Sequence, residues 1–501
     1  MKRLLERIRQ HAVERPQVPA IRDETVQLDW RSLNLEVDRL SDKLLANRVG
    51  LLLANGVHWA CLDLALLKGD RVCVPMPEFF SDSQLLHLIR DADLDMVVTD
   101  DRERVAALLN GQSHARIDVA GRPVWLFWRK ANAPDDTVQP LHRETVKVTY
   151  TSGTTGQPKG VCLSGETIWN ATASLCEAVQ ACPQDRALSL LPLSTLLEEI
   201  AGLYAPLWVG AQAQLPDLAA CGLAGSAGPQ TGQLFDALRF YAPTTTTLVP
   251  QLLKLMVEGM RPGIPVPDSL RFIAVGGAPT PSGLIERARA LGLPVFQGYG
   301  LSEAGSVACL STPSFERSGS VGRPLPHLHV SVAEDGEVLV SGNLLLGYLG
   351  HTEPAANEAW QTGDLGYLDE DGFLYLTGRK KTAYATAYGR NVSPEWVESE
   401  LTSHPLIAQA AVFGEGQAIN VAVLVPVPNA NLQDVQTALQ CINCGLPKYA
   451  RIGGWIEADQ RFSHSNGLAN GAGGIDRQAV WRQYQTRIEQ HYSAAERHVI
   501  F

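Results

Sequence analysis

The chain has 501 residues, of which 45% are hydrophobic and 19% charged, with a mean hydropathy of −0.04. This length exceeds what one hydrophobic core usually supports, and the composition excludes disordered and fibrous proteins, so two or more globular domains are expected. The net charge is −11 and no basic block occurs, which argues against nucleic acid as a partner.

The N-terminus predicts an amphipathic helix rather than a signal peptide. Leu4, Leu5, Ile8 and Val13 recur at helical spacing, without the continuous apolar core that a signal peptide needs. No stretch reaches the roughly 18 uninterrupted apolar residues of a transmembrane segment. A surface helix packed against the protein is favoured over peripheral membrane contact through the basic face.

The nine cysteines are scattered, an odd number without the spacing of a disulfide framework. This distribution indicates reduced thiols and a cytoplasmic protein. Cys441 and Cys444 form a lone CxxC pair, which is more often two buried helix cysteines than a zinc or redox site.

The first half of the chain alternates short apolar runs with helical patterns, which predicts the α/β class with βαβ units and a largely parallel sheet. The last of these strands ends at Gly276 and Gly277, at the edge where open α/β sheets place their ligand crevices. The predicted strands cover residues 49–53, 71–75, 95–99, 146–150, 186–192, 244–249 and 270–275, and the predicted helices cover 58–67, 81–92 and 196–209.

From about residue 319 the pattern changes to short strands and hairpin signals, which predicts a β-rich subdomain over residues 319–379. Its strands are expected at 328–332, 337–340 and 372–376. A compact α+β unit should follow, so residues 1–379 and 380–501 are predicted to be the two domains. The second domain is expected to contain helices at 394–403 and 432–440 and strands at 407–413 and 420–426.

The most informative segment is a loop that follows the strand predicted over 146–150. Three glycines expose backbone N–H groups, four hydroxyl side chains add donors, and a lysine adds positive charge, which together suit a polyphosphate. A surface linker is the alternative, but linkers rarely end in Pro-Lys-Gly before an apolar run. The spacing does not match a Walker loop, so another kind of nucleotide site is expected. The loop consists of Thr151, Ser152, Gly153, Thr154, Thr155, Gly156, Gln157, Pro158, Lys159 and Gly160.

Two later segments place polar groups at the ends of predicted strands. Glu303 is a hard oxygen ligand suited to Mg²⁺, and Tyr299 nearby offers a flat face for a purine. Asp364 follows a glycine turn, where two carboxylate oxygens can hold the hydroxyls of a ribose. Arg379 adds a cation for the same sugar and phosphate. Each segment taken alone is also compatible with an ordinary turn.

Together and in this order, the segments resemble the acyl-adenylate-forming (AMP-binding) superfamily, which includes acyl-CoA synthetases, peptide-synthetase adenylation domains and luciferases. The resemblance runs from residues 19–21 to 446–450, and residues 150–160 are its most specific part. Residues 191–194 with Glu198, and residues 378–381, 389–394 and 465–468, are most similar to the long-chain acyl-CoA synthetase branch.

The resemblance implies roles for individual residues. The loop from Thr151 to Lys159 would hold the β- and γ-phosphates of ATP. The implied catalytic residues are Thr151, Lys159, Glu303 and Arg379. Gly277, Ala278 and Tyr299 would line the adenine, and Gly300 would also belong to the ATP site. Ser302 would contact the α-phosphate, Glu303 would bind Mg²⁺, and Asp364 would bind the ribose with Arg379 beside it. The hinge would lie at Lys380 or Lys381.

The chemistry that the resemblance implies has two halves. A carboxylic acid, with a fatty acid as the first candidate, would attack ATP to give acyl-AMP and pyrophosphate. A thiol, from CoA or from phosphopantetheine on an acyl carrier protein, would then displace AMP. The protein would supply positioning and positive charge. The small C-terminal domain would be mobile and rotate about the hinge between the two halves.

The chain departs from the family pattern at two positions. The family's C-terminal lysine bridges the carboxylate and the α-phosphate, whereas this chain has Gly474 at the matching position and no lysine after Lys448. Loss of one such donor costs about 10²–10³ in rate, by analogy with oxyanion donors. Thr195 stands where the family often has a ring, in a pocket expected to be lined by Trp208, residues 245–249 and residues 276–278.

Three explanations for Gly474 remain open. Arg477 or another cation reaches in and leaves a slow ligase; adenylation is lost while nucleotide or acyl-adenylate binding remains; or the Gly-rich segment 467–474 closes differently. Two other functions are weighed against the ligase: a non-catalytic nucleotide-binding protein that scaffolds or regulates other enzymes, and an enzyme whose adenylate passes to an amine or is trapped by a partner.

Overall fold

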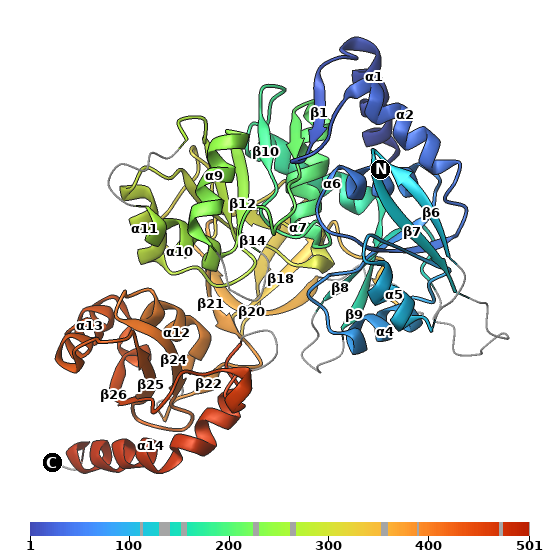
Figure 1. Cartoon of the computed structure of the whole chain (residues 1–501). Helices are drawn as coiled ribbons and strands as arrows, with labels where there is room; N and C mark the ends of the chain where they lie inside the picture. Colours follow the sequence, from blue (N-terminus) through green and yellow to red (C-terminus); the bar gives the residue numbers. More distant parts are fainter. Residues whose placement is uncertain are drawn as a thin grey trace.

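The computed structural model describes residues 1–110, 114–129, 141–151, 158–223, 230–260, 267–351, 359–387, 390–469 and 474–499. Two large sheets with surrounding helices form the main body, and a smaller sheet with its own helices forms a lobe beside it (Figure 1). The predicted class, α/β with a large N-terminal part and a small α+β C-terminal part, is confirmed.

The first large sheet has eight strands in the described part of the chain, and its centre is parallel while its outer pairs are antiparallel. The central strands are buried at almost every position, as strands covered on both faces must be. In spatial order the strands are β19 (Gly347–Tyr348), β9 (Lys159–Ser164), β8 (Thr145–Thr151), β4 (Val72–Pro75), β3 (Arg48–Leu52), β5 (Met96–Thr99), β7 (Arg122–Trp128) and β6 (His114–Val119).

The second large sheet has nine strands among the described residues, with antiparallel pairs only at its two ends. In spatial order they are β16 (Arg323–Pro324), β15 (Cys309–Leu310), β14 (Val295–Tyr299), β13 (Phe272–Val275), β12 (Thr245–Leu248), β10 (Arg186–Leu188), β11 (Gln212–Gln214), β1 (Pro19–Arg22) and β2 (Gln27–Asp29). Because β12, β13 and β14 are parallel, their carboxyl ends meet at one edge, where the sequence predicts the ligand site.

Helices surround both sheets, and α3 (Val57–Lys68) is buried along almost its whole length. The N-terminal α1 (Lys2–Glu14) buries Leu4 and Ile8, and Arg7 lies over the ring of Trp208. The structure therefore supports the packed surface helix. The other helices of the main body are α2 (Trp30–Ser41), α4 (Asp82–Asp91), α5 (Arg102–Leu108), α6 (Gly165–Ala178), α9 (Thr231–Tyr241), α10 (Pro250–Gly259), α11 (Ser282–Ala290) and the short η2 (Ser302–Ala304).

The helix predicted over residues 196–209 is present but is not regular. It consists of α7 (Leu196–Glu198), the π-helical turn η1 (Glu199–Tyr204) and α8 (Ala205–Val209), which follow one another without a break. A π-helical turn inserts an extra residue into the helical repeat and shifts where the following side chains point.

The β-rich region contains an antiparallel sheet of β17 (Leu328–Val332), β18 (Glu337–Gly342), β20 (Trp360–Leu368) and β21 (Leu374–Arg379). The sequence predicted β17 and β18 and part of β21, but not β20. This longest strand of the sheet contains Gly363, whose φ of 72° is open mainly to glycine.

The C-terminal lobe has one hydrophobic core on each side of its three-stranded sheet. Its elements are β22 (Tyr384–Ala385), β23 (Asn391–Val392), α12 (Pro394–Thr402), β24 (Ile407–Phe413), β25 (Asn420–Pro426), α13 (Leu432–Gly445), η3 (Lys448–Ala450), β26 (Ile452–Glu457), η4 (His464–Asn466) and α14 (Arg477–Val499). Both strands that the sequence predicted here have the predicted bounds, whereas β26 and α14 were not predicted.

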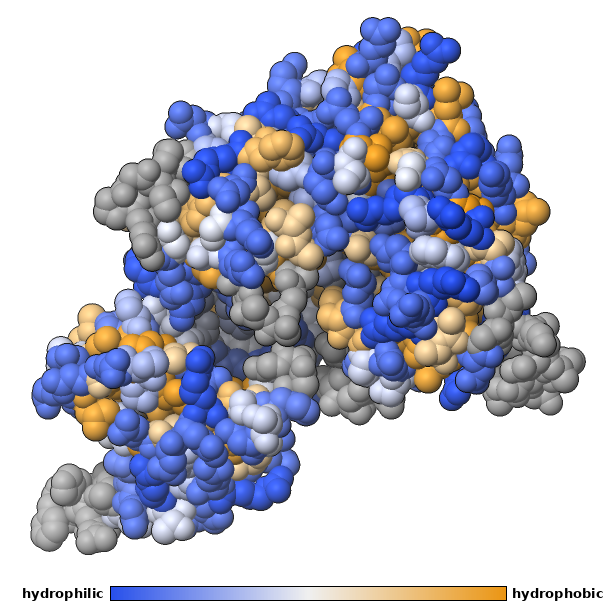
Figure 2. Space-filling view, viewed as in Figure 1, coloured by the Kyte–Doolittle hydropathy of each residue, from blue (hydrophilic) through white to orange (hydrophobic). Residues whose placement is uncertain are grey.

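The lobe contacts the main body through α12. Ser399 Oγ donates to the Pro279 carbonyl at 3.4 Å, and Lys254 Nζ donates to the Thr402 carbonyl at 3.3 Å. On the face shown in Figure 2 the surface is mostly hydrophilic, and a recess separates the lobe from the main body. Among the described residues, no helix is both long and apolar enough to cross a membrane.

The expectation for the CxxC pair is correct about the helix and wrong about the burial of the thiols. Cys441 and Cys444 lie on α13 but are exposed. The alternation of polar and apolar residues along α13 buries Val435, Ala438 and Leu439 and leaves both thiols on the solvent side.

Candidate active site

Strand pairing fixes the two ends of the glycine-rich loop. In the antiparallel β8–β9 pair, Thr151 lies opposite Lys159. The Pro158 carbonyl lies 3.1 Å from His87 Nε2, which connects the exit of the loop to α4. The other predicted phosphate-binding residues lie outside the described residues: Ser152, Gly153, Thr154, Thr155 and Gly156.

Lys159 and Glu303 both interact with Tyr348, a residue that no sequence pattern indicates. Tyr348 OH donates to Glu303 Oε1 at 2.8 Å, and Lys159 Nζ lies 5.7 Å from the centre of the Tyr348 ring. Burial, together with the charge of Glu303, raises the pKa of Tyr348, so its hydroxyl remains a neutral donor. Tyr348 belongs to the two-residue strand β19, which is too short to give a periodic signal.

Asp364 is the centre of a second polar group. Tyr299 OH donates to Asp364 Oδ2 at 2.6 Å, and Arg379 Nε lies 2.7 Å from Asp364 Oδ1. The β20–β21 register places Asp364 opposite Arg379, so the predicted pairing of the two residues is a consequence of the sheet. The Asp364 side chain is 9% exposed and that of Arg379 is 63% exposed. Burial raises the pKa of Asp364, while the Arg379 charge and the Tyr299 hydrogen bond oppose this shift.

A cavity of about 220 Å³ opens at the carboxyl ends of β13 and β14. Four predicted residues line it: Gly277, Tyr299, Gly300 and Ser302. A Cβ atom at position 300 would lie 1.6 Å from the Ser306 carbonyl oxygen, so only glycine fits there. The predicted adenine contact Ala278 is exposed and is not part of the lining.

The lining expected for the acyl pocket is partly present in this cavity. Thr195 and Thr247 line the larger cavity with Gly276, as predicted. Trp208 does not line it, because its ring packs edge-on against Trp169 with the centroids 4.1 Å apart.

The expected hinge and the expected replacement cation are both engaged in contacts. Lys380 Nζ donates to Asp335 at 2.7 Å and to Glu337 at 2.6 Å, which holds it to the β-rich sheet. Arg477 Nη2 donates to both carboxylate oxygens of Glu398 at 2.7 Å. In this arrangement Arg477 is therefore not a free cation that replaces the missing lysine. The hinge role of Lys380 and Lys381 stays a prediction.

Comparison with known proteins identifies the family. A model described as "AMP-binding enzyme" matches residues 8–349, and one described as "AMP-binding enzyme C-terminal domain" matches residues 383–496. The chain belongs to the AMP-binding enzyme family. The resemblance to the acyl-adenylate-forming superfamily is thereby confirmed.

Similar proteins of the AMP-binding family are ligases. One is the long-chain-fatty-acid–CoA ligase FadD15 of Mycobacterium bovis, 29% identical over 445 residues that cover 77% of this chain and 74% of the relative. Another is a 2-succinylbenzoate–CoA ligase of Bacillus cereus, 28% identical over 435 residues that cover 81% of this chain and 84% of the relative. The predicted enzyme class, an AMP-forming acid–thiol ligase, is confirmed.

Among solved structures, the o-succinylbenzoate CoA synthetase MenE of Bacillus subtilis in complex with its acyl-adenylate intermediate has the same fold. The TM-score is 0.74 at 24% identity, over 95% of this chain and 97% of that chain. The AMP-binding fold thus extends over the main body and the C-terminal lobe.

Proposed function

We propose that this AMP-binding enzyme activates a carboxylic acid with ATP and transfers the acyl group to the thiol of CoA. The observation that carries the proposal is a row of polar groups along the larger cavity. Asp364 accepts a hydrogen bond from Tyr299 in the cavity wall, and Ser302 lies in the same wall. Glu303 follows in the sequence and is bonded by Tyr348, whose ring Lys159 approaches. This order matches a ribose, an α-phosphate and a polyphosphate with its metal ion.

The nucleotide is proposed to bind along this row. The adenine would lie at Gly277, Ala278 and the Tyr299–Gly300 segment, the ribose at Asp364, and the α-phosphate at Ser302. Asp364 already accepts a hydrogen bond from Tyr299 and forms an ion pair with the largely exposed Arg379. Since an exposed arginine can move at little cost, the ribose can take its place and leave Arg379 to the phosphate.

Glu303 suits a shared Mg²⁺ site. Among the residues that the structure describes, no cluster of three or more His, Cys, Asp or Glu side chains could hold a metal ion by itself. Mg²⁺ commonly takes one or two carboxylates and completes its shell with substrate phosphates and water, which fits a single glutamate beside a polyphosphate loop. Bound there, the ion would neutralise phosphate charge, and Lys159 and Thr151 would add donors.

The acid and the thiol are proposed from the relatives. FadD15 favours a fatty acid, in agreement with the long-chain motifs of this chain, and 2-succinylbenzoate is the second candidate. CoA is the thiol that both relatives use by name. We also propose that residues 1–379 and 380–501 act as two units, the second of which turns about Lys380 and Lys381.

The test combines product analysis with ATP binding. The protein is incubated with ATP, Mg²⁺, CoA and a panel of fatty and aromatic acids, and mass spectrometry should detect AMP and at least one acyl-CoA. In calorimetry, Asp364→Asn should weaken ATP binding about 10–100-fold, because a hydrogen bond to a charged group is lost. Asp371→Asn, a change at an exposed carboxylate in the same region, should leave ATP binding unchanged. No heat of ATP binding and no AMP with any acid would contradict the proposal.

A further inference from the structure

We propose that a smaller cavity next to the larger one selects the acid substrate by the end that is remote from its carboxylate. The preferred acids carry a hydroxyl or another neutral hydrogen-bonding group at that end, and Glu198 binds this group. The inference rests on the proposed function, since it names the substrate class of the same site. Glu198 would be a specificity-determining residue, remote from the reacting atoms.

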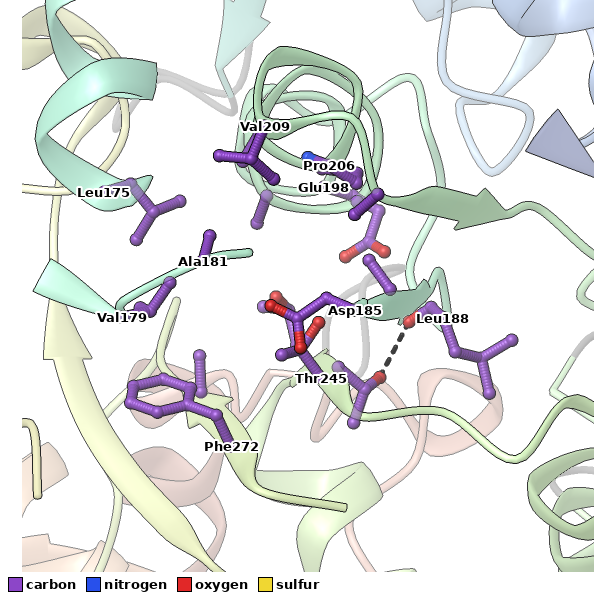
Figure 3. A pocket seen from close by; sticks show the side chains of 18 residues that line it. Leu175, Val179, Ala181, Asp185, Leu188, Glu198, Pro206, Val209, Thr245 and Phe272 are labelled. Atoms are coloured by element: carbon purple, nitrogen blue, oxygen red, sulfur yellow. Dashed lines mark hydrogen bonds between the residues drawn. The ribbon is translucent and has the colours of Figure 1, made fainter. Parts of the chain in front are cut away.

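The two cavities adjoin. The smaller one has a volume of about 60 Å³ and lies between the helix over residues 196–209, α6 and the strands β10, β12 and β13 (Figure 3). It shares four lining residues with the larger cavity: Leu175, Ala201, Thr247 and Ala274. The tail of an acid whose carboxylate lies beside the nucleotide would point into this space.

The smaller cavity is mostly apolar, with side chains such as Val179, Val209 and Phe272, but Glu198 interrupts this surface. Figure 3 shows its carboxyl directed away from the helix, toward the strand side where Asp185 and Thr245 lie. Glu198 is fully buried, and within the described part of the chain neither of its carboxyl oxygens has a partner at hydrogen-bonding geometry. Buried polar groups are nearly always paired in folded proteins, so an unpaired carboxyl in a cavity wall points to a ligand.

Asp185 in the same wall provides the contrast. Its carboxylate accepts from Arg271 Nε at 2.8 Å, from Thr244 Oγ1 at 2.7 Å and from the Cys182 amide at 2.9 Å. A carboxylate with a structural role in this fold is therefore fully paired, and Glu198 is not.

Glu198 is the last residue of α7, and the π-helical turn begins at the next residue. Its neighbour Glu199 is bonded to Lys147 and Tyr204 in a separate buried cluster, while Glu198 faces the cavity. Gly202, one turn later, provides the space for the carboxyl. A Cβ atom there would lie 2.6 Å from Glu198 Oε1 and 2.3 Å from Ser189 Oγ, a second buried polar atom without a described partner.

The protonation state of Glu198 favours a neutral partner. Burial raises its pKa to about 8, although the Ser189 hydroxyl and the Leu190 amide lie close enough to oppose the shift. At neutral pH the group is a carboxylic acid that can donate and accept one hydrogen bond each. A terminal hydroxyl satisfies both, whereas a methyl end leaves the buried acid unpaired, and sites of this kind discriminate strongly against the analogue that lacks the polar group.

The experiment compares straight-chain acids of several lengths with and without a terminal hydroxyl. For the best length, kcat/KM of the wild-type protein should be about 10–100-fold higher with the hydroxy acid. Glu198→Leu should abolish this preference and improve the use of the plain acid. Glu198→Gln should keep the preference, because an amide also donates and accepts. Thermal melting of each variant verifies that it is folded.

Two outcomes would overturn the inference while leaving the proposed function intact: equal kcat/KM for both acids in the wild type, or a preference that survives Glu198→Leu. A preference for a terminal amine over the hydroxyl would also overturn it, because it requires a charged Glu198. Calorimetry of the same acids without turnover gives an independent result: the hydroxy acid should bind more tightly to the wild type than to Glu198→Leu. If no acid yields AMP, the proposed function fails. Calorimetry then shows whether the protein still binds the hydroxy acid more tightly than the plain acid.

Discussion

At the scale of single residues, the buried carboxyl of Glu198 links the stability of the protein to pH. Its pKa is about 8 in the folded protein, against 4.5 for an ordinary glutamate. Between these values the folded state holds a proton that the unfolded state has released, so the free energy of unfolding falls as the pH rises. Glu198→Gln removes the titrating group, and the loss of stability from about pH 5 to about pH 8.5 should shrink by about 2–4 kcal/mol.

Urea unfolding at the two pH values measures this difference. Glu177→Gln, at an exposed position of α6, is the matched control and should leave the pH dependence as it is in the wild type. Parallel stability curves for the wild type and Glu198→Gln would show that Glu198 does not carry a raised pKa.

The site residues that the sequence predicts lie in local motifs, whereas those that it does not predict depend on contacts between distant segments. Asp364 and Arg379 were predicted because each lies in a recognisable motif, and the sheet register then pairs them. Tyr348 was missed because its role depends on β19 lying beside β9, a pairing of segments far apart in the sequence. Glu198 was noted only as part of a branch motif, since burial and an absent partner are properties of the folded molecule.

At the scale of elements, a buried ionic cluster joins β8, α3 and the π-helical turn. Lys147 Nζ bonds Asp63 at 2.7 Å, Tyr204 at 2.9 Å and also Glu199, and the charged side chains are fully buried. Removing one partner of such a cluster leaves unpaired buried charge. Lys147→Met should therefore lower the free energy of unfolding by about 3–5 kcal/mol.

The control for this prediction is an ion pair near the surface. Lys68 pairs with Asp38, and their side chains are 29% and 43% exposed. Lys68→Met should cost less than about 1 kcal/mol in the same denaturant titration. An equally small effect of Lys147→Met would mean that the charge of Lys147 is not needed to stabilise the buried Asp63 and Glu199.

Elements were predictable where local pattern and tertiary environment agree. β24 and β25 have the bounds that the sequence predicts, because both are mainly apolar runs between turn residues. The helix over residues 196–209 was predicted as regular, and its π-helical turn was not. Lys147, which fixes Glu199, comes from a strand about fifty residues earlier in the chain, and no local pattern reports such a contact.

At the scale of the whole molecule, Gly474 is the position where the sequence predicts a departure from the family pattern, a missing C-terminal lysine. Arg477, the nearest cation in the sequence, is paired with Glu398 and Glu395 in the lobe. If the missing lysine limits adenylation, Gly474→Lys should raise the rate of pyrophosphate exchange by about 10²–10³, the amount that one positioned charge-stabilising donor contributes. The rate at which the acyl group is transferred from a chemically supplied acyl-AMP to CoA should stay unchanged.

Gly445→Lys adds the same charge to the lobe at the end of α13, where a Cβ atom would contact nothing within 4 Å. It should leave the exchange rate unaltered. If Gly474→Lys behaves like Gly445→Lys, the absence of the lysine does not limit the reaction.

The assembly of the whole molecule was predictable as a class but not in detail. Alternating strands and helices indicated parallel sheets, and the centres of both large sheets are parallel. The antiparallel strands at the sheet edges, such as β6 and β7, were not predicted, because a strand with one exposed face and mixed composition gives a weak pattern.

The exposed cysteines of α13 offer a practical advantage. Cys441 and Cys444 lie three positions apart on one helix, so their side chains share a face, and the other seven thiols are buried or half-buried. A bifunctional maleimide dye should bridge the two and be held rigidly against the helix. Polarised fluorescence from this single label would test, in real time, the proposed reorientation of the lobe during turnover.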